Sequence, residues 1–423
     1  INMIQIRRSR VIAVADFRHR MEMKIPRKLS TKRYSMEKSR ILITCAKGIA
    51  PFLKQELLQL GFPALSETIA GIATEGTLDD TLRLNLLLRT GHRVLFHLRD
   101  FMAHDSDALY HAVSSIAWEE YIAEDGYVSV ASHVDSPNIR DSRYANMKCK
   151  DAIVDRIKEK CGRRPDSGPD QSRTVVNLYG KNGQYSLYID TSGEPLSRRG
   201  YRKIPLNAPM QETLAAAVIM ATGWSGRGHF INPMCGSGTL AIEAALTGLN
   251  RASGLLRDNY GFMHLKRFDK TGWDALRILT KKEARKTLDF RIIATDIREK
   301  AVEAARKNAA TAGVEHIIEF SVANYSETAI PDGAGIVILN PEYGERMGTG
   351  KELEGVYKGI GDFLKQKCRG YTGYLFTGNF DLAKKVGLHA QRRIPFFNGP
   401  IECRLLEYEL YEGSKKQTII KDR

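Results

Sequence analysis

The chain has 423 residues, enough for two or three domains, and a formal net charge of +15, which points to a polyanionic partner. No apolar run approaches the length that spans a bilayer, so the sequence predicts a soluble protein that needs no membrane. The six cysteines contain no Cys-x-x-Cys pair. This argues against a metal site or a disulfide framework and favours reduced thiols in the cytoplasm.

The positive charge is concentrated at the start of the chain. Residues 1–35 hold ten lysines and arginines against two acidic residues, so more than half of the excess lies there. Met36 opens a sequence of ordinary composition, and we predict that residues 1–39 are a basic leader that does not fold. A basic arm and a transit-peptide-like segment are the alternatives. Residues 414–423 form a basic tail.

Strands and helices alternate irregularly between residues 40 and 195, which predicts a small α+β region. The patterns indicate a strand, a turn and an amphipathic helix at 40–62, a helix at 79–98, a strand at 127–134, a basic amphipathic helix at 146–162 and a hairpin at 174–193. The hairpin is expected because two alternating runs flank Lys-Asn-Gly, which is typical of tight turns.

From residue 205 onward the pattern changes to a strand followed by a helix, repeated along the chain. Short apolar strands are expected at 229–232, 290–296, 317–323, 335–340 and 371–377. This rhythm predicts a doubly wound α/β domain over 196–413, with its site at the carboxyl ends of the strands. The last segment, RRIPFFNGPIECRLLEYEL, reads as two strands around an Asn-Gly turn. Such a hairpin at the edge of a parallel sheet is typical of methyltransferases rather than of dehydrogenases.

The segment HFINPMCGSGTLAIEAAL, residues 229–246, predicts a strand, a glycine turn and a helix. Gly236 and Gly238 would allow the backbone to approach a ligand closely. A dinucleotide fingerprint would require a third glycine where Ala241 stands, and a phosphate-binding loop would require a lysine after the turn. The turn alone leaves open whether it binds an adenosine-bearing cofactor or is only structural.

A carboxylate ends the next strand. Asp296 closes RIIATD and directly precedes a helix with an Ala-rich face. A carboxylate there can accept hydrogen bonds from both ribose hydroxyls of a bound adenosine, and a surface or helix-capping role is the alternative. The separation from Gly238 exceeds the roughly 20 residues of a simple nucleotide-binding unit. A basic insertion at 248–289, which contains Trp273, explains the difference.

The sequence IVILNPEYGERMG places Asn-Pro-x-Tyr at the end of another buried strand. The Asn340 side-chain oxygen and the Pro341 carbonyl can accept the two N–H bonds of an exocyclic amine. That would draw the nitrogen towards a tetrahedral geometry and aim its lone pair at an electrophile. Tyr343 can stack on the base. A plain strand-ending turn is the alternative, but the combination with the glycine turn and Asp296 favours chemistry on an amine.

Six segments carry a resemblance to a known family: CAKGIAPFLKQEL, DAIVDRIKEKCGRRP, RRGYRKIPLNAPMQETLAAA, NPMCGSGTLAIEAA, NPEYGERMG and FFNGPIECRLLEYE. Together they resemble class I S-adenosylmethionine-dependent methyltransferases with a THUMP domain, especially the RlmL-type guanine-N2 methyltransferases of bacterial 23S rRNA. The resemblance covers about residues 40–412. It implies a ferredoxin-like and THUMP RNA-binding region at 40–195, a Rossmann-like catalytic domain at 196–413 and S-adenosylmethionine as the cofactor.

The resemblance also carries roles to particular residues. Those implied to bind the cofactor are Asn232, Pro233, Cys235, Gly236, Gly238, Asp296, Asn324, Gln211, Glu212 and Thr213. Asn324 replaces an aspartate that contacts the adenine in many relatives, and a simple helix start is the alternative for residues 211–213. Asn340, Pro341 and Tyr343 match the catalytic (Asn/Asp)-Pro-Pro-(Tyr/Phe) motif. Glu342 replaces the second proline, which bears on how rigidly the loop is held.

Cys235 lies beside the glycines, but it is not expected to be a nucleophile. No histidine lies near it in the motif, and N-methylation needs no covalent enzyme intermediate.

A basic helix and the arginine pair after it are expected to contact RNA phosphates. The residues concerned are Lys148, Lys150, Lys158, Lys160, Arg163 and Arg164. An ordinary solvated helix face is the alternative.

The sequence therefore favours an RNA guanine-N2 methyltransferase that acts on 23S rRNA. A tRNA guanine-N2 methyltransferase is an alternative, because the THUMP signature does not choose between the two RNAs. A DNA adenine-N6 methyltransferase shares the Asn-Pro-x-Tyr logic, but the N-terminal region argues against it. A non-catalytic RNA-binding or assembly factor is a fourth reading, which the intact Asp296 and Asn340 disfavour. Many relatives are fused to a second methyltransferase, and we expect one catalytic domain in this chain.

Overall fold

The computed structural model describes residues 37–68, 71–136, 139, 141–204, 206, 210–343 and 350–411. Residues 1–36 of the expected leader and the expected tail at 414–423 lie outside the described residues. The rest divides into two compact units. The first contains the described residues up to Cys45 together with Leu53–Leu196 and Asp258–Thr280. The second contains Ala46–Phe52, Ser197–Arg257 and the described residues from Lys281 onward.

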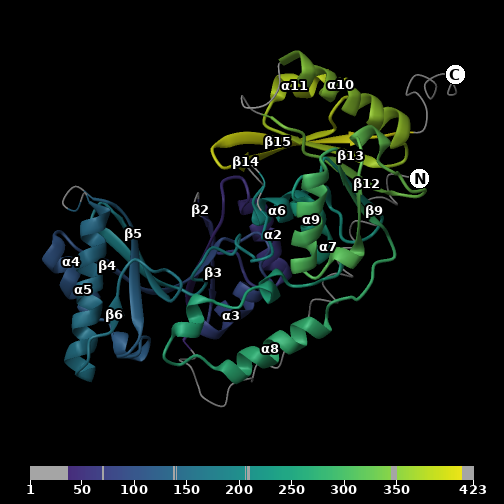
Figure 1. Cartoon of the computed structure of the whole chain (residues 1–423). Helices are drawn as coiled ribbons and strands as arrows, with labels where there is room; N and C mark the ends of the chain where they lie inside the picture. The colour runs from purple at the N-terminus through teal and green to yellow at the C-terminus, as the bar shows by residue number, and fades with distance from the viewer. Residues whose placement is uncertain are drawn as a thin grey trace. The chain divides into compact units, whose positions relative to one another are not determined.

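The first unit is built on one mixed sheet (Figure 1). Within the described residues its eight strands run in the order β2-β3-β1-β4-β8-β7-β5-β6. Their bounds are β1 Ser39–Thr44, β2 Ser66–Thr68, β3 Gly71–Gly76, β4 Arg93–Met102, β5 Tyr127–Asp135, β6 Asp166–Ser167, β7 Thr174–Lys181 and β8 Gln184–Asp190. The helices are α2 Ala50–Gln59, whose first three residues belong to the second unit, α3 Leu78–Leu87, α4 Ser106–Ser114 and α5 Ser142–Cys161. Buried side chains of α5 pack with Trp118 and with strand residues such as Leu178 in one core.

The prediction of a single helix at 79–98 is wrong in its second half. Helix α3 begins at a capping box formed by Thr77 and Asp80, but it ends at Leu87, and β4 follows. Consecutive residues of β4, from Val94 to Phe96, are buried on both faces of the sheet. A strand buried on both faces reads as a continuous apolar run, which periodicity does not distinguish from a buried helix.

The predicted hairpin at 174–193 is confirmed. Strands β7 and β8 pair in register around Asn182 and Gly183, whose φ angles are 50° and 81°. Two positive φ angles in succession are what a type I′ turn requires, and asparagine followed by glycine tolerates them best.

The second unit is a doubly wound sheet covered by helices (Figure 1). Among the described residues its seven strands run in the order β11-β10-β9-β12-β13-β15-β14. They are β9 His229–Pro233, β10 Ile292–Asp296, β11 Ile318–Val322, β12 Gly335–Leu339, β13 Thr372–Thr377, β14 Arg392–Asn398 and β15 Ile401–Glu409. The helices are α6 Glu212–Thr222, α7 Thr239–Gly248, α9 Glu299–Thr311, α10 Gly350–Lys367 and α11 Phe380–Lys385.

Strands β9 to β13 are parallel to one another, and the β14–β15 hairpin adds antiparallel strands at one edge. This confirms the predicted α/β fold and its closing hairpin.

The basic insertion is divided between the two units. We expected residues 248–289 to extend the C-terminal domain, but Asp258–Thr280 clusters with the first unit. Within that unit, Asn259 Nδ2 donates to the Ser172 carbonyl at 2.6 Å, and Lys266 Nζ donates to the Glu119 carbonyl at 2.9 Å. Trp273, on helix α8 (Lys270–Lys282), is buried. These contacts join residues distant in sequence, so the local pattern could not reveal them.

No helix in the described part of the chain is both long and apolar enough to cross a membrane. The described residues also contain no cluster of three or more His, Cys, Asp and Glu side chains that could hold a metal ion.

Candidate cofactor and amine site

The predicted site residues converge at the carboxyl ends of three neighbouring strands. β9 pairs in parallel with β10 on one side and with β12 on the other, so the residues that follow these strands lie at one edge of the sheet. The chain order reverses between β9 and β12. Ligands of doubly wound sheets bind at such a switch point.

The glycine turn leaves room for a ligand. Gly236 and Gly238 have φ angles of 56° and 83°, a region that side chains rarely adopt. A Cβ atom on Gly238 would lie 2.9 Å from the Cβ of Ala305, so this glycine lets the start of α7 approach α9. A Cβ atom on Gly236 would meet nothing within 4 Å. Gly236 therefore faces open space, whereas Gly238 serves packing.

Asp296 is buried and bound to the glycine turn. Its Oδ2 accepts from the backbone N–H of Gly236 at 3.0 Å. Its Oδ1 accepts from the backbone N–H of Arg298 at 3.0 Å and from Arg298 Nε at 3.3 Å. A carboxylate offers about four acceptor positions, so about one remains unused. The structure thus brings the expected ribose acid directly against the expected cofactor loop.

Asn340 directly follows β12, and its side-chain oxygen is unpaired in the described structure. This Oδ1 is buried and has no hydrogen-bond partner among the described residues. Buried polar atoms are nearly always paired, and an unpaired one is costly. The atom is therefore an acceptor available to a ligand.

Tyr343 is held by the closing hairpin. Asn398 Nδ2 at the end of β14 donates to Tyr343 Oη at 3.0 Å, and the ring of Tyr343 contacts Phe376 of β13 edge-on at 6.2 Å between centroids. Burial raises the pKa of the Tyr343 phenol well above its usual value. The side chain is therefore neutral, with a fixed ring. Sequence reasoning did not identify Asn398 as part of the site.

Asn324 begins a short 3-10 helix, and its oxygen is already used. Its Oδ1 accepts from the Ser326 backbone N–H at 3.0 Å and from Ser326 Oγ at 2.9 Å. The Nδ2 group remains to donate, so this side chain offers a ligand a donor, which an ionised aspartate would not.

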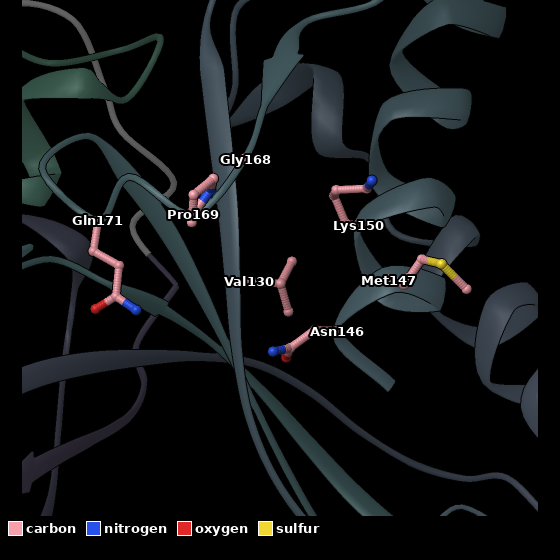
Figure 2. Close-up of a pocket in the computed structure, with 7 residues that line it drawn as sticks. All are labelled: Val130, Asn146, Met147, Lys150, Gly168, Pro169 and Gln171. Atoms are coloured by element: carbon pink, nitrogen blue, oxygen red, sulfur yellow. The ribbon is translucent and has the colours of Figure 1, made fainter. Parts of the chain in front are cut away.

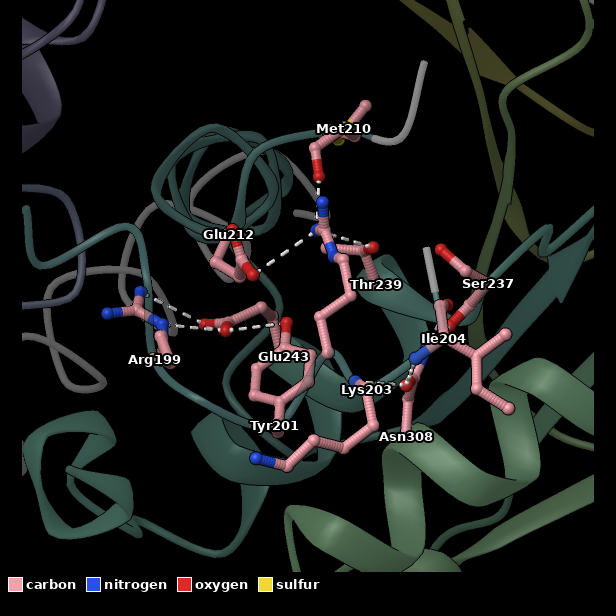
Figure 3. Close-up of polar contacts among 11 residues, drawn as sticks. Arg199, Tyr201, Lys203, Ile204, Met210, Glu212, Ser237, Thr239, Glu243 and Asn308 are labelled. Carbon is pink, nitrogen blue, oxygen red and sulfur yellow. Dashed lines mark hydrogen bonds and ion pairs between the residues drawn. The ribbon is translucent and has the colours of Figure 1, made fainter. Parts of the chain in front are cut away.

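The segment before α6 is tied to the cofactor-loop helix by a buried polar network (Figure 3). Arg199 Nε donates to Glu243 Oε1 of α7 at 2.8 Å, and Tyr201 Oη donates to the same oxygen at 3.1 Å. Asn308 of α9 accepts from the backbone N–H groups of Lys203 and Ile204 through its Oδ1. This network positions the segment that leads to residues 211–213.

Among residues 211–213, only Gln211 is exposed. Thr213 is buried. Glu212 is also buried and pairs with Arg202 Nη2 at 3.4 Å. Burial raises the pKa of Glu212, although Arg202 partly opposes the shift. The sequence left open whether Glu212 contacts the cofactor or belongs to a simple helix start. In the structure its carboxylate is paired with Arg202, which favours a structural role.

Cys235 is buried, and burial raises the pKa of its thiol well above the usual value. A protonated, buried thiol is a poor nucleophile, in line with the expectation that Cys235 does not act as one.

The expected RNA-contacting residues lie on α5 of the first unit and just after it, but several already have acidic partners. Lys148 pairs with Asp107 at 3.4 Å, and Arg164 pairs with Asp151 at 3.6 Å. Lys150 and Lys160 pair with the acidic residues beside them. Lys158 and Arg163 are exposed and have no acidic partner among the described residues. Arg163 is therefore the arginine of the pair whose charge is available.

A cavity of about 340 Å³ opens beside this helix (Figure 2). It is lined by Val130, Asn146, Met147, Lys150, Gly168, Pro169 and Gln171. Asn146 Oδ1 is buried without a partner in the described part of the chain, and Lys150 lies one helical turn further on. The cavity thus combines an unused acceptor with a cation.

Comparison with known proteins agrees with this geometry. Three family models match in order: the RlmL ferredoxin-like domain at residues 40–95, the THUMP domain at 103–190 and the RMKL-like methyltransferase domain at 199–407. The chain is 34% identical over 368 residues to the putative RNA methyltransferase slr0064 of Synechocystis sp., and the match covers 87% of this chain and 96% of that protein. The chain belongs to the RMKL-like methyltransferase family.

Two further similarities support the assignment. The chain is 37% identical over 381 residues to the ribosomal RNA large subunit methyltransferase K/L of Syntrophotalea carbinolica, and it spans about half (53%) of that protein's length. The crystal structure of the putative methyltransferase SMU.472, complexed with SAH, matches with a TM-score of 0.81 at 26% identity, over 89% of this chain and all of that one. The resemblance to THUMP-containing class I methyltransferases is confirmed for this RMKL-like chain.

Proposed function

We propose that this RMKL-like chain transfers a methyl group from S-adenosylmethionine to the exocyclic N2 amine of a guanine in structured RNA. The favoured substrate is 23S rRNA in the cytoplasm. The observation that carries the proposal is the buried, unpartnered Oδ1 of Asn340 at the end of β12. An unpaired acceptor of this kind can receive an N–H group of an exocyclic amine. Asp296, at the end of another strand of the same sheet, is the proposed acceptor for the ribose hydroxyls.

The residues at the ends of β9 and β10 fit the cofactor. Asp296 has about one unused acceptor position, and the open space beside Gly236 adjoins it. We assign the ribose hydroxyls to Asp296 and a ring nitrogen of the adenine to the Asn324 Nδ2 donor, because Asn324 Oδ1 already binds Ser326. When bound, S-adenosylmethionine supplies an electrophilic methyl group.

Asn340 and Pro341 act on the amine. The Asn340 oxygen and the Pro341 carbonyl accept its N–H groups, which localises the nitrogen lone pair that is otherwise delocalised into the base. Tyr343 offers its ring face to the base, and Asn398 fixes the orientation of that ring. No side chain needs to form a covalent intermediate.

The first unit supplies RNA affinity. Lys158 and Arg163 present free charges, and the cavity beside α5 adds Lys150 and an unpartnered acceptor on Asn146. The contacts that lysine and arginine make with phosphate position a polyanion without reading its sequence. Base choice then rests with the second unit.

The decisive experiment offers the protein labelled S-adenosylmethionine with separate pools of unmodified 23S rRNA, tRNA and DNA. The modified nucleoside is identified after digestion. We expect N2-methylguanosine from the rRNA pool. N2-methylguanosine from tRNA alone would move the substrate to tRNA, and N6-methyladenine in DNA would replace the proposal.

An absence of transfer to every pool, with wild-type affinity for S-adenosylhomocysteine, would favour a non-catalytic RNA-binding factor. The cofactor affinity itself is measurable by calorimetry and does not depend on finding the RNA.

A further inference from the structure

Glu342 lies where the resemblance places a second proline, and the structure provides an ionic partner for it. Glu342 Oε1 lies 3.3 Å from Arg298 Nη1, and both side chains are about half exposed. The Glu342 carbonyl also lies within 3.5 Å of the Tyr357 hydroxyl of α10, which donates to it. The residue between the two catalytic positions Pro341 and Tyr343 is therefore bound from two directions.

Arg298 is placed to do more than neutralise one carboxylate. The same guanidinium donates from Nε to Asp296 Oδ1 at 3.3 Å. One side chain thus bridges the acid at the end of β10 and the loop after β12, two segments that are 44 residues or more apart in the chain. The sequence does not show this bridge, because Arg298 reads as an ordinary residue just before the helix with the Ala-rich face.

A loop that lacks the second proline needs another constraint. Proline fixes its own φ angle near −65° and so limits the conformations that a loop can adopt. Glutamate leaves that freedom, and the loop must then be ordered by contacts. In the described structure, the side-chain contact at this position is the one from Arg298.

We propose that Arg298 is a positioning residue that holds the Asn340–Tyr343 loop through Glu342 and couples it to Asp296. The ion pair takes over the role of the proline that is absent at position 342. This inference rests on the proposed methyl transfer, because the loop it orders carries Asn340 and Tyr343. Arg298 itself is assigned no contact with the amine.

The first test is a double-mutant cycle measured by single-turnover methyl transfer. Half-exposed ion pairs are weak, so we expect Arg298→Gln and Glu342→Gln each to lower the rate about threefold to fivefold. The double variant should be no slower than Arg298→Gln alone, because Glu342→Gln removes one of the two contacts that Arg298→Gln already removes. Affinity for S-adenosylhomocysteine should change less than the rate does.

The second test introduces the missing proline. In a Glu342→Pro background the loop no longer depends on the ion pair, so Arg298→Gln should lower the rate clearly less than it does in the wild type, because only its bond to Asp296 remains to be lost. Arg306→Gln is the matched control. Arg306 lies on α9, the helix that Arg298 precedes, it is also about half exposed, and its ion-pair partner at 3.7 Å is Glu315 rather than a residue of the loop. That variant should behave as the wild type does.

Hydrogen exchange provides a readout that does not require turnover. The amides of Glu342 and Tyr343 should exchange faster in Arg298→Gln than in the wild type or in Arg306→Gln. Three outcomes would each overturn the inference. They are unchanged amide exchange in Arg298→Gln, a double variant whose rate loss is the product of the two single losses, and a rate loss from Arg298→Gln that is as large with Pro at position 342 as in the wild type. If the wild type methylates no nucleic acid, the proposed function fails, while the exchange result still decides whether Arg298 orders the loop.

Discussion

Two asparagines, each followed by proline, lie at the ends of neighbouring parallel strands of the second unit, and their side chains make different contacts. Asn232 at the end of β9 is fully buried, and its Nδ2 donates to the Ile338 carbonyl of β12 at 3.0 Å, while its Oδ1 has no partner among the described residues. Asn340 after β12 is partly exposed, and its buried Oδ1 has no partner among the described residues. In the described part of the chain both side chains therefore carry an unused acceptor, and what distinguishes them is the amide hydrogen bond by which Asn232 joins β9 to β12. The same dipeptide at a strand end holds two strands together only where its amide reaches a neighbouring carbonyl.

The largest expected effect comes from Asn340→Ala. Removing a preorganised acceptor lowers turnover by about 10²–10³. Affinity for S-adenosylmethionine should stay near the wild-type value, because Asn340 is assigned to the amine. Single-turnover kinetics and calorimetry measure the two quantities separately. A near wild-type rate would show that Asn340 is not the acceptor and would remove its contrast with Asn232.

Asp296→Ala sharpens the comparison by separating cofactor binding from chemistry. The variant loses the charged acceptor to which the ribose hydroxyls are proposed to donate, so cofactor binding should weaken by about 2–3 kcal/mol. It also frees the Gly236 N–H that Asp296 Oδ2 accepts. Calorimetry with S-adenosylhomocysteine gives the affinity. An unchanged dissociation constant would move the ribose site away from β10.

Asn232→Ala tests the structural half of the comparison. The change removes a buried hydrogen bond between β9 and β12, and the free energy of unfolding should fall by about 1–3 kcal/mol. Asn340→Ala should cost clearly less, since no described hydrogen bond of its side chain is lost. Urea denaturation of the two variants side by side gives the difference. The reverse ranking would mean that the two asparagines had been assigned the wrong way round.

The smallest effect is expected from Arg163→Ala combined with Arg164→Ala. RNA affinity should fall several-fold, and the dependence of binding on salt should become less steep by about one to two released ions. Cofactor affinity and unfolding should not change. The matched control, Lys384→Ala with Lys385→Ala, removes the same charge from residues that pair with Asp381 and Glu354. An effect of equal size in the control would show that net charge rather than a defined surface holds the RNA.

Sequence alone determined the parts of this protein that depend on local backbone chemistry. The turn at Asn182-Gly183, the positive φ angles at Gly236 and Gly238, and the placement of Asp296 and Asn340 at strand ends all follow from residues close together in the chain. Tertiary structure decided the rest. Residues 93–102 became a strand because they pair with β1 and β8, with Val94–Phe96 buried on both faces. Residues 258–280 joined the first unit through contacts with Ser172 and Glu119.

The same division holds within the site. The sequence predicted site roles for Asn340, Tyr343 and Asp296 but not for Asn398 or Arg298, because the contacts of those two with Tyr343 and Glu342 join residues 44 or 55 positions apart in the chain. The sequence also predicted that Lys148 and Arg164 contact RNA phosphates, whereas the fold brings Asp107 and Asp151 within 4 Å of them. Charge and hydrogen-bond capacity are properties of a residue, but whether that capacity is already used depends on which distant residues the fold places beside it.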